Sequence, residues 1–314
     1  MSTIGPIGVP GRPWGEPERD LWRSRQSRRR SYHDDVVTPL NALRDRFERV
    51  AYGQITYSDD AYPLYALRSR VIRPERPAAL VTGGVHGYET SGVLGALAFL
   101  DQVAGTYAES INLLVVPCVS PWAYERIHRW NYDAIDPNRN FRPGGPVEAT
   151  ALIDLARTFA HDYLVHVDLH ETTDTDRTEF GPALSARDGT VFVERETPDV
   201  FYVVADSENR QLEFQRAIIA EVERVTHIAR PDARGEIIGS PVIAHGVIEY
   251  PMARLALCPS ITNARFKAST EVYPDSVRTT PDICILAQVT AVRAALDFAL
   301  APRRQTARTG PSDV

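Results

Sequence analysis

Short runs of apolar residues alternate along the chain with longer segments in which apolar residues recur at every third or fourth position. The short runs predict strands, and the longer periodic segments predict helices. Strands are expected at residues 64–72, 78–82, 111–119, 164–169, 201–205 and 265–272, and helices at residues 35–50, 91–103, 147–163, 211–227 and 281–300. Strands that alternate with helices of this length indicate an α/β fold, with a mixed, mostly parallel central sheet and helices on both of its faces.

The two ends of the chain lack this periodicity. Residues 1–30 are rich in Gly, Pro and Arg and end in three consecutive arginines. This composition indicates an arm that is either loose or wrapped on the surface. Residues 302–314 are polar and are expected to form a frayed tail. The segment between them, residues 31–301, is expected to form a single domain.

The balance of charges excludes some classes of function. The net charge is -6 and the isoelectric point is near 5.8, which argues against a nucleic-acid-binding protein. The chain has neither an apolar leader nor an uninterrupted apolar run of membrane-spanning length, so we expect a cytoplasmic protein without a membrane partner. The cysteines Cys118, Cys258 and Cys284 are odd in number and far apart, which indicates neither disulfides nor a cysteine-bound zinc. Nothing in the sequence indicates an oligomeric state.

Residues able to do chemistry first gather after the predicted strand at residues 78–82. His86 is followed three positions later by Glu89, and no other histidine of the chain has an acid at this offset. Ligands bind at the carboxyl ends of strands in open α/β sheets, and imidazole and carboxylate suit a zinc ion. Taken alone, the pair also fits a loop histidine and an acid near the positive end of a helix dipole.

A second group lies on the predicted strand that begins at residue 164. Side chains alternate along residues 165–171, so that the apolar ones share one face while His166, Asp168 and His170 share the other. His170 is at the carboxyl end of this strand, on the same rim as His86 if the strands are parallel, and is the natural third ligand. His166 and Asp168 lie deeper and fit hydrogen-bonded core groups, with His166 as an alternative ligand.

A third group contains Arg126, Arg129 and the sequence DPNRNF at positions 136–141. Pro121 and Pro143 flank this region, which indicates a loop. An arginine at the rim of a metal site can bind a carboxylate through two parallel hydrogen bonds. A solvated basic loop is the alternative interpretation.

In this order the motifs resemble those of the zinc carboxypeptidases and of their relatives, the aspartoacylase and succinylglutamate desuccinylase branch. These families carry H-x-x-E, then an arginine with D-x-N-R-N/D-F, then a D-x-H-E strand, and finally T-x-E or a similar motif. Here the four motifs begin at His86, Arg129, Asp168 and Ser269. The resemblance covers roughly residues 64–275 and implies a zinc carboxypeptidase-like α/β fold.

The resemblance implies one zinc ion per chain, held by His86, Glu89 and His170. Asp136 would support His86 through a hydrogen bond. Glu271 would be the general base that takes a proton from the zinc-activated water, whose pKa zinc lowers from about 15.7 to about 7. A surface acid at the end of a strand is the alternative interpretation of Glu271.

The resemblance also assigns residues to the substrate. Arg129 would polarise the scissile carbonyl, with Arg126 as the fallback. Asn138 and Arg139 would bind the carboxylate of the substrate. Tyr250 is the candidate for the tyrosine that closes over the substrate, although no clear motif surrounds it.

The predicted function is therefore that of a zinc-dependent, carboxypeptidase-like hydrolase, with residues 31–301 as its catalytic domain. It would cleave an amide bond adjacent to a free carboxylate, in a small peptide or an N-acyl amino acid. An N-acyl amino-acid deacylase of the aspartoacylase or desuccinylase type is the alternative, and the spacing between Glu89 and His170 is closer to that branch. A non-catalytic binding protein is disfavoured because the metal ligands and Glu271 occur together. The polar residues 172–198 are expected to form a loop at the pocket wall.

Overall fold

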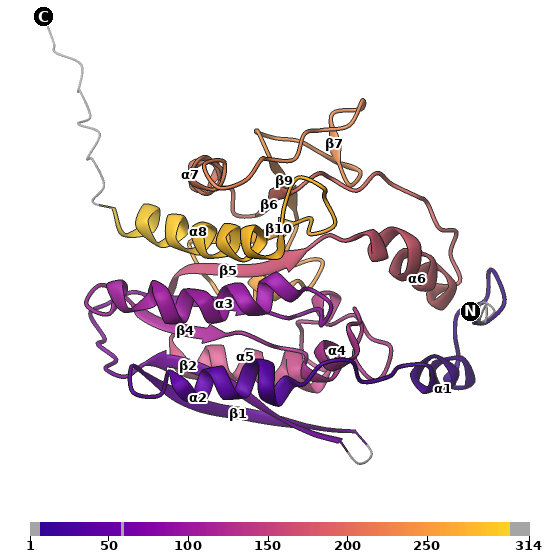
Figure 1. Ribbon diagram of the computed structural model, residues 1–314, viewed down its shortest axis with the longest axis horizontal. Coiled ribbons are helices and arrows are strands. Elements are labelled where there is room, and N and C mark those ends of the chain that lie inside the picture. Colours follow the sequence, from indigo (N-terminus) through magenta and orange to yellow (C-terminus); the bar gives the residue numbers. More distant parts are fainter. Residues whose placement is uncertain (1–6, 58–59, 302–314) are drawn as a thin grey trace, which may run out of the picture.

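The computed structural model describes residues 7–57 and 60–301, and eight strands of this part of the chain form one sheet (Figure 1). In spatial order they are β1 (Phe47–Tyr57), β2 (Asp60–Ser69), β4 (Asn112–Val116), β3 (Ala78–Gly83), β5 (Tyr163–Glu171), β10 (Phe266–Val272), β6 (Phe201–Asp206) and β9 (Val247–Tyr250). A separate small sheet pairs β7 (Glu236–Ile237) with β8 (Ser240–Pro241).

The α-helices that accompany the sheet are α1 (Glu16–Ser24), α2 (Thr38–Ala42), α3 (Thr90–Gln102), α4 (Pro121–Arg126), α5 (Val147–Phe159), α6 (Gly181–Asp188), α7 (Leu212–Val222) and α8 (Pro281–Leu300). Shorter helical turns are η1 (His33–Val37), η2 (Ala104–Tyr107), η3 (Pro137–Arg139), η4 (Asp176–Phe180) and η5 (Cys258–Ile261).

The four central strands β4, β3, β5 and β10 are parallel to one another. At one edge β2 is antiparallel to β4, and β1 is antiparallel to β2. At the other edge β6 is antiparallel to β10, and β9 runs parallel to β6. The parallel centre brings the carboxyl ends of β3, β5 and β10 to one rim, which is where ligands bind in such sheets.

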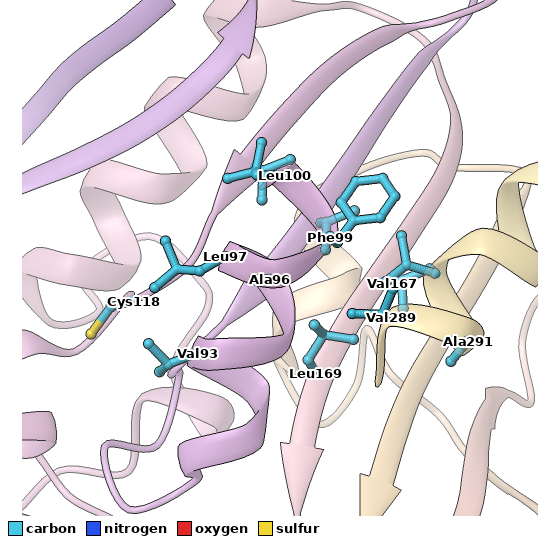
Figure 2. Packing of buried hydrophobic residues seen from close by; sticks show 14 of the residues in the cluster. Val93, Ala96, Leu97, Phe99, Leu100, Cys118, Val167, Leu169, Val289 and Ala291 are labelled. Carbon is cyan, nitrogen blue, oxygen red and sulfur yellow. The ribbon is translucent and has the colours of Figure 1, made fainter. Parts of the chain in front are cut away.

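The two faces of the sheet bury different sets of apolar side chains, because alternate residues of a strand point to opposite sides. On one face Val81 and Val167 belong to the same buried cluster as Val93 of α3 and Val289 of α8, and Figure 2 shows part of this cluster. On the other face Leu80 packs with residues of α5. The predicted α/β fold, with a mixed, mostly parallel sheet and helices on both faces, is confirmed.

The helix predicted over residues 35–50 is wrong in its second half. The helical part ends at Ala42, and Phe47 begins β1. Apolar residues every three or four positions fitted a helix, but Phe47 is buried in the core as part of a strand. Pairing with β2, from Phe47 opposite Ser69 to Tyr57 opposite Asp60, supplies the backbone hydrogen bonds that a helix would have made internally.

Helix α8 is the one described helix that is long and apolar enough to cross a membrane by length and composition. It packs instead against α3, α7 and the strands β5 and β10, and many of its residues are buried. Burial on several sides accounts for its apolar character, as in other core helices.

The described part of the amino-terminal arm wraps around the domain near α4. Trp14 and Trp22 are only 7% and 4% exposed. Their rings lie 6.0 and 5.6 Å from the ring of Trp130, and Trp22 also lies 5.9 Å from Trp122. These tryptophans anchor the arm, whereas the first six residues of the predicted arm and the predicted tail at residues 302–314 lie outside the described residues.

Candidate metal centre

Three side chains converge at the rim formed by the parallel strands. His86 lies in the turn that follows β3, Glu89 immediately precedes α3, and His170 is near the carboxyl end of β5. One nitrogen or oxygen atom from each residue lies within 4.8 Å of the others, and all three side chains are buried. This is the cluster that the sequence predicts as zinc ligands.

Both imidazole rings face Glu89 with the same ring nitrogen, Nδ1. The Nδ1 atoms of His86 and His170 lie 2.7 Å from the two carboxylate oxygens of Glu89. Their Nε2 atoms face other carboxylates, at 2.9 Å from Asp136 and at 2.5 Å from Asp168. A carboxylate behind a histidine fixes the orientation and the tautomer of the ring, which leaves the opposite nitrogen free to bind a metal.

The electrostatics of the cluster favour a bound cation. Burial would raise the pKa of Glu89, but the two imidazoles lower it to about 2. Burial lowers the pKa of His170, but Asp168 and Glu89 raise this pKa by a larger amount, so that the net shift is upward. Burial and Arg129 lower the pKa of His86, whereas Glu89 and Asp136 raise it and prevail. Each imidazole therefore sits between two carboxylates, where either a proton or a metal ion is stabilised.

Glycine is required in the turn that carries His86. Gly84 has a φ of +60°, a conformation that residues with a β-carbon rarely adopt. At Gly87 a β-carbon would collide with the backbone of Ala123 and Tyr124 in α4. The turn is thus pressed against α4, and this contact limits the positions that His86 and Glu89 can take.

Glu271 lies beside the cluster. It is the neighbour of His170 in the parallel pairing of β10 with β5, and it is half-buried. One of its carboxylate oxygens accepts a hydrogen bond of 2.9 Å from the hydroxyl of Thr172. Burial raises the pKa of Glu271 to about 7, against the opposing effect of His170. Its carboxyl group can therefore exchange a proton near neutral pH.

The two candidate arginines have different environments. Arg129 lines the same cavity as the cluster, and its Nε and Nη1 donate to Asp136 at 3.1 Å and to Asp176 at 3.3 Å. Its Nη2 has no hydrogen-bond partner among the described residues and remains able to donate to a ligand. Arg126 instead pairs with Asp60 at 2.8 Å and lies over the ring of Trp122. The structure does not bring the fallback Arg126 to the cavity.

The predicted substrate-binding residues all line this cavity, which has a volume of about 500 Å³. The side-chain oxygen of Asn138 accepts a hydrogen bond from the backbone of Cys258 at 2.8 Å, and its amide nitrogen lies 3.3 Å from Nε2 of His170. Arg139 is exposed and donates to the carbonyl of Asn138 at 2.7 Å. Tyr250 is contributed by the end of β9. A larger cavity of about 1010 Å³ adjoins this one, since Arg195 and Ile238 line both, but it contains none of the predicted substrate-binding residues.

The polar segment after His170 is part of the wall, but it is not a simple loop. It contains η4 and α6, and Asp176, Arg177 and Leu184 from these turns line the cavity. Hydrogen bonds from Thr173 to Asp176 close the first turn. Residues Val191 to Val193 then complete the wall without regular secondary structure.

Comparisons with known proteins show which family and which folds the chain is similar to. Residues 75–191 match the family described as the succinylglutamate desuccinylase/aspartoacylase catalytic domain, and this segment contains all three residues of the cluster. The fold is similar to that of a metallo-carboxypeptidase from Burkholderia cenocepacia, with a TM-score of 0.57, at 12% sequence identity, over 92% of this chain and 69% of the other. Residues 75–191 therefore resemble the catalytic domain of that family, and the chain as a whole shares the zinc carboxypeptidase fold. Glu271 and Tyr250 lie outside the matched segment.

Other solved structures share this superfamily fold. A candidate metallopeptidase from Shewanella amazonensis SB2B has a TM-score of 0.65 and 22% identity, over 89% of this chain and 100% of the other. A second one, from Shewanella denitrificans OS217, has a TM-score of 0.63 and 18% identity, over 84% and 89% of the two chains. At such identities the likeness concerns the fold. A comparison with curated protein sequences finds no match.

Within this zinc carboxypeptidase fold, the structure adds residues that the sequence did not single out. Tyr88 donates a hydrogen bond of 2.8 Å to Asp176, and Arg129 lies within 3.2 Å of its hydroxyl. Gln288 of α8 donates to the backbone carbonyl of His170 at 2.8 Å and accepts from Thr270 at 2.5 Å. A glutamine that stands between apolar residues of α8 was the available signal for this contact.

Proposed function

We propose that the protein is a zinc-dependent hydrolase that cleaves an amide bond adjacent to a free carboxylate. The observation that supports this best is the convergence of two imidazole nitrogens and one carboxylate, with Glu271 beside them in one cavity. A catalytic zinc site has three protein ligands of these types and keeps a further position open.

The residues of the cluster fit a single zinc ion per chain. His86 and His170 would bind through Nδ1, because their Nε2 atoms are hydrogen-bonded to carboxylates. Glu89 would supply the third ligand atom. When bound, the ion would supply Lewis-acid chemistry and make water a better nucleophile at neutral pH.

The remaining residues would handle protons and charge. Glu271 would act as the general base and return the proton to the leaving nitrogen, and its raised pKa of about 7 suits this exchange. Arg129 would direct its free Nη2 to the scissile carbonyl, where a fixed positive donor stabilises a developing oxyanion. Its Nε and Nη1 are held by acidic partners, so the guanidinium would not need to reorganise during the reaction.

Arg139 and the amide nitrogen of Asn138 would bind the free carboxylate of the substrate. A guanidinium on the exposed side of the cavity can bind a carboxylate bidentately, which fixes its orientation as well as its charge. Tyr250 would lie over the bound substrate from β9. A small peptide and an N-acyl amino acid both offer a carboxylate at this distance from an amide.

The second candidate is an N-acyl amino-acid deacylase of the aspartoacylase or desuccinylase type. The match of residues 75–191 to that catalytic domain favours it specifically. Both candidates use the same cluster, and they differ in the group on the far side of the scissile bond. The expected cytoplasmic location and the expected absence of nucleic-acid and membrane partners stay predictions.

The test is incubation of the zinc-loaded protein with a panel of carboxyl-terminal dipeptides and tripeptides and of N-acyl amino acids, with products identified by mass spectrometry. Each substrate is paired with its carboxyl-amide analogue. Cleavage of the free acids and not of the amides supports the proposal. The class that is cleaved decides between peptidase and deacylase, and no cleavage of either class by protein that holds one zinc ion would contradict the proposed activity.

A further inference from the structure

Arg30 connects the amino-terminal arm to the turn that carries the candidate metal ligands. Its Nη2 donates to the backbone carbonyl of Gly87 at 3.0 Å, and its Nη1 donates to the hydroxyl of Thr90 at 2.8 Å. Its Nε donates to the carbonyl of Tyr124 at 3.2 Å, and the guanidinium lies 4.3 Å above the ring of the same tyrosine. One side chain thus spans the turn and α4.

The two acceptors on the turn bracket the carboxylate ligand. Gly87 directly follows His86, and Thr90 directly follows Glu89. Within the turn itself, the hydrogen bond from the amide of Glu89 to the carbonyl of His86 is long, at 3.4 Å. Contacts from outside the turn therefore contribute much to holding its backbone in this conformation.

Helix α3 begins without a side-chain cap of its own. Glu89 occupies the capping position, but its carboxylate faces the two histidines rather than the helix amides. Glu171 accepts hydrogen bonds from the amides of Thr90 at 3.1 Å and of Ser91 at 2.6 Å instead. Arg30 and Glu171 thus fix the two sides of the residue that follows Glu89, and this leaves the Glu89 carboxylate available for a metal.

Arg30 is itself held in place by neighbouring contacts. The backbone amides of Arg29 and Arg30 donate to the carbonyl of Glu125 at 2.7 and 3.1 Å. Trp22 packs against Trp122 and Trp130, which precede and follow Glu125 in the sequence. The guanidinium is therefore directed at the turn by a backbone that is bonded to α4.

We propose that Arg30 is a positioning residue for the metal centre, which holds the turn at residues 84–90 in the geometry that lets His86 and Glu89 bind one ion. This inference rests on the proposed function only in that the ion is taken to be zinc. An arginine suits the role because its planar fork donates in three directions at fixed angles, whereas a lysine offers a single point charge.

Residues that orient metal ligands from outside typically change metal affinity 10- to 100-fold when they are altered. Arg30 acts through the backbone and through Thr90, so we expect an effect near the lower end, about 10-fold. Arg30→Gln should weaken zinc binding by this factor, and Arg30→Lys should recover part of it. Zinc affinity is measured by competition with a chromophoric chelator at a temperature where all variants are folded by circular dichroism.

Arg28→Gln is the matched control on the same segment. Arg28 pairs with Asp60 and Glu125 and, within the described part of the chain, forms no hydrogen bond with the turn. Its substitution should leave the zinc affinity within the error of the wild-type value. Equal losses of affinity in the Arg28 and Arg30 variants would show a general effect of the arm and would overturn the specific role of Arg30.

A second measurement does not need the ion. Hydrogen exchange of the metal-free protein should show faster exchange of the amides at residues 85–91 in Arg30→Gln than in the wild type, with no change in the central strands. Thr90→Val removes the acceptor of Arg30 without touching the arm, and it also removes the hydrogen bond of 3.2 Å from Thr90 to the carbonyl of Tyr88. Combined with Arg30→Gln, it should give less than the sum of the two single effects.

The outcomes separate this inference from the proposed function. Wild-type protein that binds no zinc would contradict the proposed function, while the exchange rates of the turn would still test the positioning role. Wild-type protein that binds zinc, together with an Arg30→Gln variant of unchanged affinity and exchange, would overturn the positioning role alone.

Discussion

His166 and His170 lie on the same face of β5, four positions apart with Asp168 between them, and both are buried. The side chains that lie within hydrogen-bond distance of His166 are neutral. Its ring nitrogens lie 3.1 Å from the hydroxyl of Thr262 and 3.4 Å from that of Thr82. Burial lowers the pKa of His166 to about 4, which outweighs the opposing effect of Asp168. This histidine remains neutral and belongs to the core.

His170 has carboxylates at both ring nitrogens. Asp168 lies at 2.5 Å and Glu89 at 2.7 Å, and together they raise its pKa in spite of burial. The residue type, the strand and the depth of burial are the same as for His166. The comparison teaches that the charge of the partners, which come from other segments, decides whether a buried histidine attracts a cation.

The most direct test of this difference between His166 and His170 is to remove each imidazole in turn. His170→Ala should lose zinc and all measurable hydrolysis, because a three-ligand site loses one of its ligands. His166→Ala should keep one zinc per chain and lose stability instead. Metal content by atomic emission and unfolding by denaturant distinguish the two. Loss of zinc in both variants would show that His166 is a ligand after all.

The neighbours on β10 offer a second pair. Glu271 lies beside His170, and Lys267 lies beside His166. Glu271→Gln should lower kcat by about 10² to 10⁴ with zinc still bound, because the general base is lost. Lys267→Gln removes the charge at the equivalent position next to His166 and should leave kcat unchanged. A Glu271→Gln variant with the wild-type rate would remove Glu271 from the mechanism.

Asp168 lies between the two histidines and bonds to the hydroxyl of Thr82 as well as to His170. Asp168→Asn should weaken zinc binding 10- to 100-fold, as expected for a carboxylate that orients a histidine ligand. Thr262→Val alters only the surroundings of His166 and should leave zinc affinity unchanged. If the Thr262→Val variant lost zinc affinity to the same degree, the surroundings of His166 would not be independent of the metal cluster.

The same contrast holds for carboxylates. Two imidazoles lower the pKa of Glu89 to about 2, whereas burial raises that of Glu148 to about 7, against a hydrogen bond from Asn131. Because the folded-state pKa of Glu148 lies above the unfolded one, its contribution to stability is complete below about pH 4.5 and is lost as the pH rises to about 7.

Glu148→Gln removes this dependence. From pH 5 to pH 8, the free energy of unfolding of the variant should increase relative to that of the wild type by about 2 kcal/mol. Denaturant titrations at the two pH values measure the change. Any effect of the substitution on the free energy of unfolding that does not depend on pH cancels in the difference. An unchanged difference would mean that Glu148 is ionised in the folded protein across this range.

The sequence was sufficient for features that depend on local alternation. The pattern of β5 places Val167 on one face and His170 on the other, and the order of motifs brings His86 and Glu89 to the same rim because the central strands are parallel. Strand ends are informative because they fix where a side chain emerges from the sheet. The resemblance then supplied Glu271, whose surroundings on β10 carry no pattern of their own.

Features that depend on partners distant in sequence could not be predicted in this way. Phe47 suited a helix until its pairing with β2 was known. Asp176 was visible as an acid in a polar segment, but its position beside Arg129 and Tyr88 depends on η4, which no periodicity indicates. Trp14 and Trp22 lie in a stretch that is otherwise poor in apolar residues, and their packing against Trp130 depends on a partner more than 100 residues away in the sequence.

The hydrogen bond between Gln288 and His170 affects when the cluster can be completed as the chain is synthesised. Gln288 is fully buried, and its amide satisfies the carbonyl of His170 and the hydroxyl of Thr270. A ribosome completes β3 and β5 long before it reaches α8, so a nascent chain has both ligand strands while these two polar groups still lack their partner. The cluster of His86, Glu89 and His170 therefore gains its full set of polar contacts only after α8 has been synthesised.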